Sequence, residues 1–439
     1  MFDLILRGGR VSAGAGATEI CDVAIADGAV AALGAEIEGR ATEVLDASGC
    51  YVLPGVVDPH VHVSGRFGSP IGCRMLVRGG VTAALDLAGD AQDLRKTLAT
   101  EGCLLTVGVL HALVPGDTVR SDSPSEQAIE ALLDQALEQG ALGLKVLGGH
   151  FPLTPEATRT VIEVCARRSA YCAIHAGTTE TGSDITGVEE LLELAGELPV
   201  HVAHVNSYCR GQIESPTMEA ARAIDALAGA PNAWSDSYLS ILNGAEARCR
   251  DGVPESGVVR TCLRLGGFDE TGEGLERAIL AGWGRIQAEI GDEIGFLEAQ
   301  AGLERFRLLD SDVGISFPVN PPASALALAL ARRADRSFIV DALGSDGGSI
   351  PRNTTLEQGV RLVQAGVLTL DDLVLKLSRT PALRLGLNRK GRLEPGADAD
   401  VIVVGADGLC RDSVIGGRIA MRDRVVVSTG GGRLLERLS

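Results

Sequence analysis

Two histidines separated by a single residue, His60 and His62, end the apolar stretch LPGVVDPHVH. Alternate residues of a β-strand point to the same face, so the two imidazoles are expected side by side. Paired imidazoles can chelate one metal ion. A surface strand can carry such a pair by chance, but this one follows a strand that enters the core. The pattern therefore favours a metal site.

Three more potential ligands end apolar segments of the same kind. His175 ends YCAIH, His204 ends VHVAH and Asp346 ends SFIVDALGSD. Each residue alone could be a buried polar group whose hydrogen bonds are satisfied in the core. Together they indicate more, because residues at the carboxyl ends of barrel strands converge on one active site. Four imidazoles and a carboxylate suit zinc and similar ions.

Lys145 lies in the middle of the apolar segment GALGLKVLGG. A buried ammonium group is costly unless it is paired or neutralised. The side chain could reach water from the end of the strand. Alternatively, burial favours the neutral amine, which CO2 can convert to a carbamate. A carbamate on Lys145 could bridge two metal ions roughly 3.5–4 Å apart.

The segments that carry these residues alternate with helical ones. The apolar runs are typical of parallel strands buried on both faces. They are residues 52–62, 80–88, 104–114, 143–148, 171–176, 200–205, 232–237 and 337–346. Helices are expected over 125–140 and 154–169, with Ser125 and Thr154 as N-caps and Pro155 in a first turn. Repeated βα units of this number predict an α/β fold, a (β/α)8 TIM barrel.

Both ends of the chain have a different texture. Residues 1–52 and 386–439 consist of short alternating strands and turns, which predicts a small β-sandwich domain formed from both termini. The barrel would then occupy residues 53–385. Within it, about 237–336 has no βα rhythm and is too long for a plain loop, so we interpret it as an insertion.

Composition narrows the class of protein. The 439 residues carry a formal charge of −18, which argues against a nucleic-acid partner. No apolar run approaches the roughly 18 residues of a membrane helix, and the first residues lack the features of a signal peptide. The ten cysteines contain no CxxC pair and are expected to be reduced thiols. We expect a cytoplasmic homo-oligomer with no membrane partner that acts on a small-molecule amide.

With these residues, the chain resembles the amidohydrolase superfamily in its binuclear branch with a carboxylated lysine. The resemblance covers nearly the whole chain, including the stretch GRLEPGADADVIVV at 391–404. It implies two divalent metal ions, with zinc expected first. It also implies a role for each ligand: His60 and His62 hold the buried ion, Lys145 bridges as a carbamate, His175 and His204 hold the second ion, and Asp346 binds the first ion and is the general base.

The resemblance implies amide hydrolysis by a metal-bridging hydroxide. Asp346 would accept the proton of the attacking water and deliver it to the leaving nitrogen. A donor must also stabilise the carbonyl oxygen as it becomes negative. Hydantoinase-like relatives use a tyrosine five residues after the bridging lysine, where this chain has His150. His150 either takes that role or is a loop residue, and Tyr208 is the other candidate.

The sequence resembles three groups of enzymes with different substrates. The segment GALGLKVLGGHFPLTPEA is similar to N-acyl-D-amino-acid deacylases, whereas HVN at 204–206 and SDGGSIP at 345–351 are similar to isoaspartyl dipeptidase. The ligands as a set match hydantoinases and dihydroorotases. Dihydroorotases usually carry an arginine two residues after the paired histidines, and Ser64 stands there in this chain.

A substrate carboxylate would need a cationic partner near the strand ends. Arg66, Arg210 and Arg352 lie in loops that follow strands, although each could equally be a solvated loop charge, and Asn206 could hydrogen-bond the substrate amide. Our first expectation is hydrolysis of an N-acyl or isopeptide-linked amino acid. The alternative is a cyclic amidase of the hydantoinase, dihydropyrimidinase or dihydroorotase kind. A deaminase conflicts with Lys145, and a non-catalytic homologue would have lost ligands.

Overall fold

The structure is a computed structural model that describes residues 1–12, 19–65 and 68–436. The chain divides into two compact units. Unit 1 contains residues 1–109, 341–348 and 353–439, and unit 2 contains residues 110–340 and 349–352. The first passage of the chain from unit 1 to unit 2 falls within strand β8 (Thr106–Leu113).

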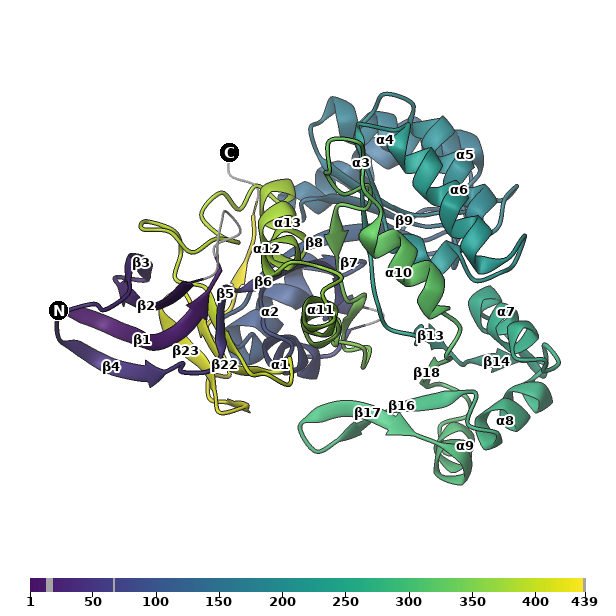
Figure 1. Ribbon diagram of the computed structural model, residues 1–439. Helices are drawn as coiled ribbons and strands as arrows, with labels where there is room; N and C mark the ends of the chain where they lie inside the picture. The colour runs from purple at the N-terminus through teal and green to yellow at the C-terminus, as the bar shows by residue number, and fades with distance from the viewer. Residues whose placement is uncertain (13–18, 66–67, 437–439) are drawn as a thin grey trace. The chain divides into compact units, whose positions relative to one another are not determined.

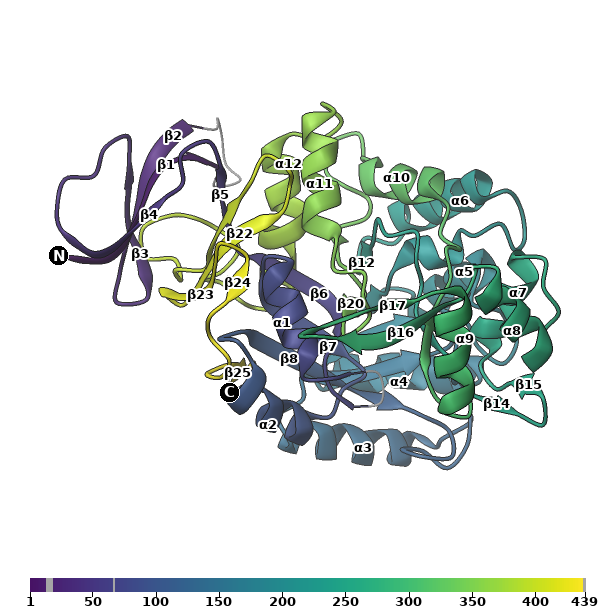
Figure 2. The same cartoon turned by 90° about the horizontal axis from the view of Figure 1, so that it is seen from below.

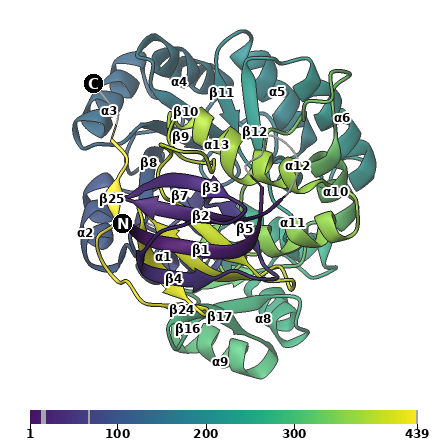
Figure 3. The ribbon, with the colours of Figure 1, turned by 60° about the vertical axis from the view of Figure 1, so that its left-hand side comes forward.

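Strands from both termini form one sheet in unit 1. Among the described residues its order is β24-β23-β22-β21-β5-β1-β2-β3, with β4 paired to β1. Figure 1 shows the purple N-terminal strands joined to the yellow C-terminal ones, and Figure 3 shows them from another side. The strands are β1 (Phe2–Val11), β2 (Glu19–Ala26), β3 (Ala29–Gly34), β4 (Ala41–Asp46), β5 (Tyr51–Pro54), β21 (Val401–Val404), β22 (Cys410–Ile415), β23 (Arg418–Arg422) and β24 (Val425–Val426).

Alternating apolar side chains explain this sheet. Leu4 and Leu6 of β1 share a buried cluster with Val52 of β5 and with Val401 and Val403 of β21. Such alternation buries one face of a strand and leaves the other to a second layer or to solvent. The predicted contribution of both termini to one strand-rich domain is confirmed, whereas the boundaries at 52/53 and 385/386 stay a prediction.

Unit 1 also contains parallel strands and helices. Strand β6 (Val56–His62) is buried along its whole length and pairs in parallel with β7 (Val81–Leu87) and β20 (Gly347–Gly348). Burial on both faces explains the continuous apolar sequence of β6 and β7. The remaining elements are α1 (Ile71–Arg78), α2 (Ala91–Glu101), β19 (Ala342–Leu343), α11 (Thr355–Gln364), α12 (Leu370–Val374), the π-helical turn η3 (Leu375–Arg379), α13 (Thr380–Arg384) and β25 (Arg433–Leu434).

Unit 2 continues the parallel arrangement from the end of β8. Its strands pair in the order β8-β9-β10-β11-β12. They are β9 (Gly143–Leu147), β10 (Tyr171–His175), β11 (Val200–Val202) and β12 (Ala233–Ser237). They alternate with α3 (Glu126–Glu138), α4 (Pro155–Arg167), α5 (Ile185–Ala195), the 3-10 turn η2 (Val205–Tyr208), α6 (Pro216–Ala228) and, later in the chain, α10 (Pro322–Leu330).

Local sequence signals fix the helix starts as predicted. The Ser125 hydroxyl accepts a hydrogen bond from the backbone N–H of Ala128 at the start of α3. Thr154 caps α4 in the same way, and Pro155 occupies the first turn. These caps satisfy backbone donors that have no partner within the helix. Within the described residues, no helix combines the length and the apolar character needed to cross a membrane.

The segment that lacked a βα rhythm forms a subdomain with its own core. Four strands pair in the order β13-β18-β16-β17, and a buried cluster that includes Leu275, Ile286 and Phe317 packs beneath them. Figure 2 shows the hairpin β16–β17 beside α7, α8 and α9. The elements are β13 (Ala245–Glu246), β14 (Cys249–Arg250), β15 (Val253–Pro254), α7 (Gly257–Leu265), α8 (Gly272–Leu280), β16 (Arg285–Ile290), β17 (Glu293–Leu297), α9 (Ala299–Leu308) and β18 (Gly314–Ser316).

The last predicted strand, 337–346, differs from the structure. Only β19 (Ala342–Leu343) is extended there, and β20 follows the turn that contains Asp346. Asp346 has φ +50° and Gly348 has φ +77°, so both lie in the left-handed region. Left-handed residues interrupt an extended strand, and the glycines around Asp346 allow this tight path.

Candidate metal centre

Three predicted ligands lie together in unit 1. His60 and His62 end β6, and Asp346 lies in the turn between β19 and β20. Asp346 Oδ1 is 3.2 Å from Nε2 of His60 and 3.2 Å from Nε2 of His62. The two imidazole rings are 5.4 Å apart and nearly perpendicular. All three side chains are buried.

This geometry fits a divalent cation. The ligand atoms of the three residues all lie within 4.8 Å of one another. Two donors bound to one tetrahedral zinc ion at about 2.0–2.1 Å stand roughly 3.3 Å apart. The distances from Asp346 Oδ1 to both imidazole nitrogens match this value. Two nitrogens and one carboxylate oxygen form a donor set that zinc accepts.

A buried carboxylate joins the two segments that carry these ligands. Asp58 Oδ1 accepts hydrogen bonds from the backbone N–H of His60 at 3.1 Å and of Ser345 at 3.2 Å. Hydrogen bonds to an ionised acceptor are among the strong ones in proteins. Asp58 therefore ties the end of β6 to the turn that carries Asp346.

A second buried carboxylate fixes the loop after the paired histidines. Asp86 Oδ2 accepts hydrogen bonds from the Ser64 hydroxyl at 2.7 Å and from the backbone N–H groups of Ser64 at 2.9 Å and Val63 at 3.2 Å. Burial raises the pKa of Asp86 to about 6, against the lowering effects of nearby His62 and of these hydrogen bonds. Ser64 therefore faces Asp86, and Arg66 lies outside the described residues.

The other predicted ligands lie in unit 2. His175 ends β10, and His204 follows β11 by two residues, with ring centroids 4.5 Å apart. Lys145 is 1% exposed in the centre of β9, where it pairs with Ala173. Since alternate residues share a face and paired residues of parallel strands point the same way, Lys145 and His175 lie on one face of the sheet.

The two predicted oxyanion donors also lie beside these histidines. The ring of His150 is 5.4 Å from that of His175. Tyr208 is fully buried, and its ring packs 5.6 Å from His175 and 5.4 Å from His204. The Tyr208 hydroxyl accepts a hydrogen bond from the backbone N–H of Ala176 at 2.8 Å. His150 is the more exposed of the two donors.

Two predicted substrate-binding arginines converge on one tyrosine. Nη1 of Arg352 lies 3.2 Å from the Tyr238 hydroxyl, and Nη2 of Arg210 lies 3.5 Å from the same oxygen. The Arg352 guanidinium also stands 4.7 Å from the centre of the Tyr238 ring and is almost fully buried. Asn320 holds the cluster together, since its side chain bonds both Arg210 and Tyr238. Unit 2 therefore contains a compact cationic cluster.

Asn206 lies next to this cluster in the hydrogen-bond network. Its Oδ1 accepts hydrogen bonds from the Ser237 hydroxyl at 3.1 Å and from the backbone N–H of Tyr238 at 3.0 Å. Its Nδ2 is buried and makes no hydrogen bond within the part of the chain that the structure describes. A buried donor of this kind is unusual and suits a bound acceptor.

Sequence reasoning missed several residues of these networks. Asp58 was within reach, since it directly precedes the paired histidines. Asp236 is the next-to-last residue of β12 and so came close to the criterion used for the predicted ligands, namely a polar residue at a strand end. Tyr238 carried no signal, because its role depends on two arginines that are distant in the sequence.

Comparison with known proteins gives one family match. The Amidohydrolase family matches residues 51–224 and 322–421. The unmatched interval contains the whole subdomain from β13 to β18. The match therefore covers the parallel strands from β6 to β11 with β19 and β20, and part of the terminal sheet, while an interval with β12 and the subdomain interrupts it.

Individual relatives agree with this match. An allantoinase of Rubrobacter xylanophilus is 29% identical over 47% of this chain, an alignment that spans 53% of that protein. A dihydroorotase of Pelotomaculum thermopropionicum is 26% identical over 96% of this chain and 99% of its own length. A D-aminoacylase structure, whose description names a binuclear metal centre, has a TM-score of 0.71 at 17% identity and covers 100% of both chains. The likeness to this structure confirms the predicted α/β barrel fold.

Proposed function

Because the chain belongs to the amidohydrolase family and is a metal-dependent hydrolase of amide bonds other than peptide bonds, we propose that its substrate is an N-acyl or isopeptide-linked amino acid with a free carboxylate. The product pair would be an amine and an acid. The choice of substrate class depends on one observation, the cationic cluster of Arg210, Arg352 and Tyr238.

That cluster suits a carboxylate for a physical reason. The guanidinium groups of Arg210 and Arg352 both lie within 3.5 Å of one tyrosine oxygen, which concentrates positive charge at this point. Arginine presents a planar fork of donors that matches a carboxylate. The free amide nitrogen of Asn206, in the same network, would hydrogen-bond the amide carbonyl of the substrate. A neutral substrate lacks the negative charge that this cluster attracts.

We also propose that all six predicted ligands serve one binuclear centre. His60, His62 and Asp346 would hold one zinc ion, His175 and His204 the second, and a carbamate on Lys145 would bridge them. When bound, metal ions of this kind supply Lewis acidity, which lowers the pKa of water and polarises a carbonyl. Burial of Lys145 supports the carbamate, since a buried amine favours its neutral form.

The residues of the chain would divide the remaining work. Asp346 Oδ1 would accept the proton of the attacking water and transfer it to the leaving nitrogen. His150 would donate a hydrogen bond to the carbonyl oxygen, because it is the more accessible of the two predicted donors. Tyr208 would hold the His175 and His204 rings in place, since its hydroxyl already binds the backbone that follows β10.

A panel of N-acyl amino acids tests the substrate class. The zinc-loaded protein should release amine from substrates with a free carboxylate and act far more slowly on the matching carboxamides. Arg352→Met should raise KM for the acids by about 10- to 100-fold, which corresponds to losing about 1.5–3 kcal/mol of charged hydrogen bonding. Arg333→Met, an arginine outside the cluster, is the control. Equal activity on acids and carboxamides would refute the proposal.

A cyclic amide is the second candidate, favoured by the sequence relatives, which include allantoinases and a dihydroorotase. The same catalytic groups would then open a ring, giving a single product with the mass of the substrate plus water. Mass spectrometry of reactions with hydantoins, dihydropyrimidines and dihydroorotate separates this outcome from release of a free amine.

We further propose that the protein works in the cytoplasm. All ten cysteines are free thiols, which suits a reducing compartment. Localisation of a tagged chain by cell fractionation tests this. The predicted homo-oligomer stays a prediction, and light scattering coupled to gel filtration would measure it.

A further inference from the structure

A row of buried polar side chains lies behind His204 in unit 2, and the proposed function leaves it unused. Asp236 Oδ1 is 3.0 Å from the backbone nitrogen of His204 and 2.7 Å from Nε2 of His201. Nδ1 of His201 in turn lies 3.1 Å from the Tyr171 hydroxyl. The row therefore runs from the first residue of β10, through the middle of β11, to the end of β12.

Packing holds this row rigidly. The His201 ring stacks on Trp234 with ring centroids 3.9 Å apart and planes 19° apart. Tyr171 meets both rings edge-on. The register pairs Ala173 with His201 and His201 with Trp234, so these side chains share the face of the sheet that carries Lys145. The orientation of Asp236 is thus set by aromatic contacts on three neighbouring strands.

Burying these polar side chains costs folding free energy. The side chains of Asp236 and His201 are both 0% exposed. Taking a carboxylate and an imidazole out of water is often no better for stability than an apolar pair of the same size. A core that needed only stability would not require them, which points to a further role for this pair.

The backbone of His204 indicates what that role is. His204 has φ +38° and ψ +60°, a left-handed backbone conformation that residues other than glycine rarely adopt. Such strain persists only where the surroundings enforce it. The backbone N–H of His204 itself donates to Asp236, and a carboxylate acceptor makes this bond strong. The left-handed turn leaves the His204 ring 4.5 Å from that of His175.

We propose that Asp236 is a positioning residue that holds His204 in its left-handed conformation, and that His201, Trp234 and Tyr171 fix Asp236 for this task. This inference rests on the proposed function in one respect, namely that His204 binds metal. Asp236 acts on the second metal ion through the backbone of its ligand, and His201 acts through Asp236.

Zinc titration of the metal-free full-length protein tests the proposal. In a His60→Ala/His62→Ala background, zinc affinity measures binding at His175 and His204 alone. There, Asp236→Asn should weaken zinc binding by about 10- to 100-fold, the usual effect of removing a group that orients a ligand. The His60/His62 site, measured in a His175→Ala background, should change less than twofold. Equal weakening at both sites, or none at the His204 site, would overturn the proposal.

Substitutions at His201 keep the test decisive if Asp236→Asn does not fold. His201→Gln keeps a hydrogen-bond donor to Asp236 near the Nε2 position. The His204 site of this variant should therefore bind zinc more tightly than the same site of His201→Ala. Equal affinities in these two variants would contradict the proposal. Asp400→Asn is the matched control, because Asp400 is 2% exposed, directly precedes β21 and pairs with Lys390 at 2.5 Å. It should lower Tm without changing zinc affinity.

One further variant separates this inference from the proposed function. If His204→Ala binds zinc as tightly as the parent chain, the second metal site itself is wrong. If His204→Ala loses zinc while Asp236→Asn and His201→Ala keep it, only the positioning role is wrong.

Discussion

Asp346 is the most constrained of the predicted ligands. It lies 3.2 Å from two imidazole nitrogens, in a left-handed turn whose preceding residue is bound by Asp58. The imidazole contacts hold the carboxylate oxygen, and the bond to Asp58 holds the backbone before it. Asp346 therefore owes its position to the buried neighbour Asp58 as well as to its own left-handed turn.

Asp346→Asn should keep the fold and lose most turnover. An amide has nearly the shape of the carboxylate but cannot accept a proton from water, and general-base catalysis contributes about 10²- to 10⁴-fold. We expect kcat to fall by that factor while the circular dichroism spectrum and Tm stay close to those of the parent. Near-normal kcat would remove Asp346 from the base role.

Lys145→Ala should release metal and abolish activity. The loss of a bridging ligand should cost more than the 10- to 100-fold that follows removal of a group behind a ligand. Short carboxylic acids supplied in the buffer can stand in for the carbamate and should restore part of the activity. Metal content by mass spectrometry and rate measurements with added acetate or propionate check this. Full activity without rescue would contradict the bridging role.

At the scale of elements, the loop that follows β9 depends on a glycine. A Cβ at Gly149 would lie 2.2 Å from Nε2 of His175. Gly149→Ala should therefore push the His175 ring aside and weaken zinc binding at that histidine by about 10-fold or more. Gly229→Ala is the control, since its Cβ would meet nothing closer than 3.5 Å. Unchanged zinc affinity in Gly149→Ala would show that the loop can give way instead.

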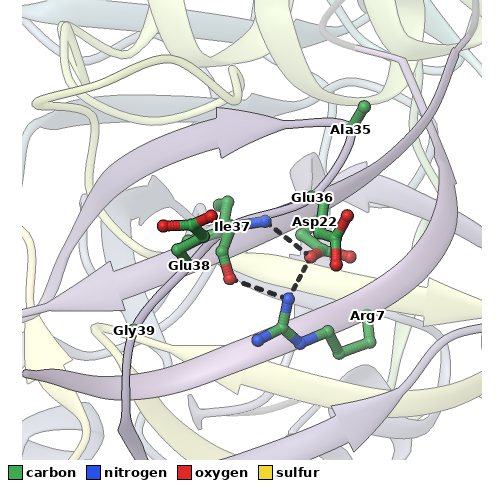
Figure 4. Close-up of a pocket in the computed structure, with 7 residues that line it drawn as sticks. All are labelled: Arg7, Asp22, Ala35, Glu36, Ile37, Glu38 and Gly39. Carbon is green, nitrogen blue, oxygen red and sulfur yellow. Dashed lines mark hydrogen bonds and ion pairs between the residues drawn. The ribbon is translucent and has the colours of Figure 1, made fainter.

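In the terminal sheet, the Asp22 carboxylate pairs with the Arg7 guanidinium, as Figure 4 shows. Burial of Asp22 opposes its ionisation, but backbone N–H groups of Ile37 and Gly8 and the Arg7 guanidinium outweigh it and lower the pKa of Asp22. The Arg7 guanidinium also donates to the carbonyl of Ile37 at 2.9 Å. The carboxylate thus joins β1, β2 and the loop that follows β3.

Asp22→Asn should destabilise the protein at pH 7 by about 2 kcal/mol, the usual worth of hydrogen bonds to a charged group. Because the folded pKa lies below the unfolded value of about 3.9, this stabilisation is full above that value and is lost as pH falls through the folded pKa. Thermal unfolding at pH 7 and pH 3 should show the difference shrinking in acid. Glu38→Gln, on the exposed rim of the same pocket, should have no effect at either pH.

For the whole molecule, bound metal should raise Tm. A ligand that binds only the folded chain stabilises it by about 2.7 kcal/mol at 100 times its Kd. Dialysis against a chelator should lower Tm, and added zinc should restore it. His60→Ala/His62→Ala should show a smaller zinc-dependent shift. An identical shift in that variant would place the stabilising ion elsewhere.

The sequence predicted the strands and helix caps well because each depends on local chemistry. The apolar run around Lys145 and the Ser125 and Thr154 caps lie where expected. It predicted the last strand poorly, because the left-handed turn at Asp346 depends on contacts with Asp58. It could not predict the meeting of Arg210 and Arg352 at Tyr238, since Arg210 is 28 residues and Arg352 is 114 residues from that tyrosine and they meet only in the folded chain.

The first and last strands of the subdomain, β13 and β18, pair with each other. Ala245 pairs with Ile315 and Glu246 with Gly314, so its two ends lie side by side although nearly 70 residues of chain separate them. A segment whose two ends adjoin in this way can be shortened or replaced without stretching the strands on either side. A short turn between Asn243 and Phe317, whose backbones already share a hydrogen bond of 3.0 Å, would close the gap. Protein engineers could graft a different segment at this junction and leave the predicted metal ligands unchanged.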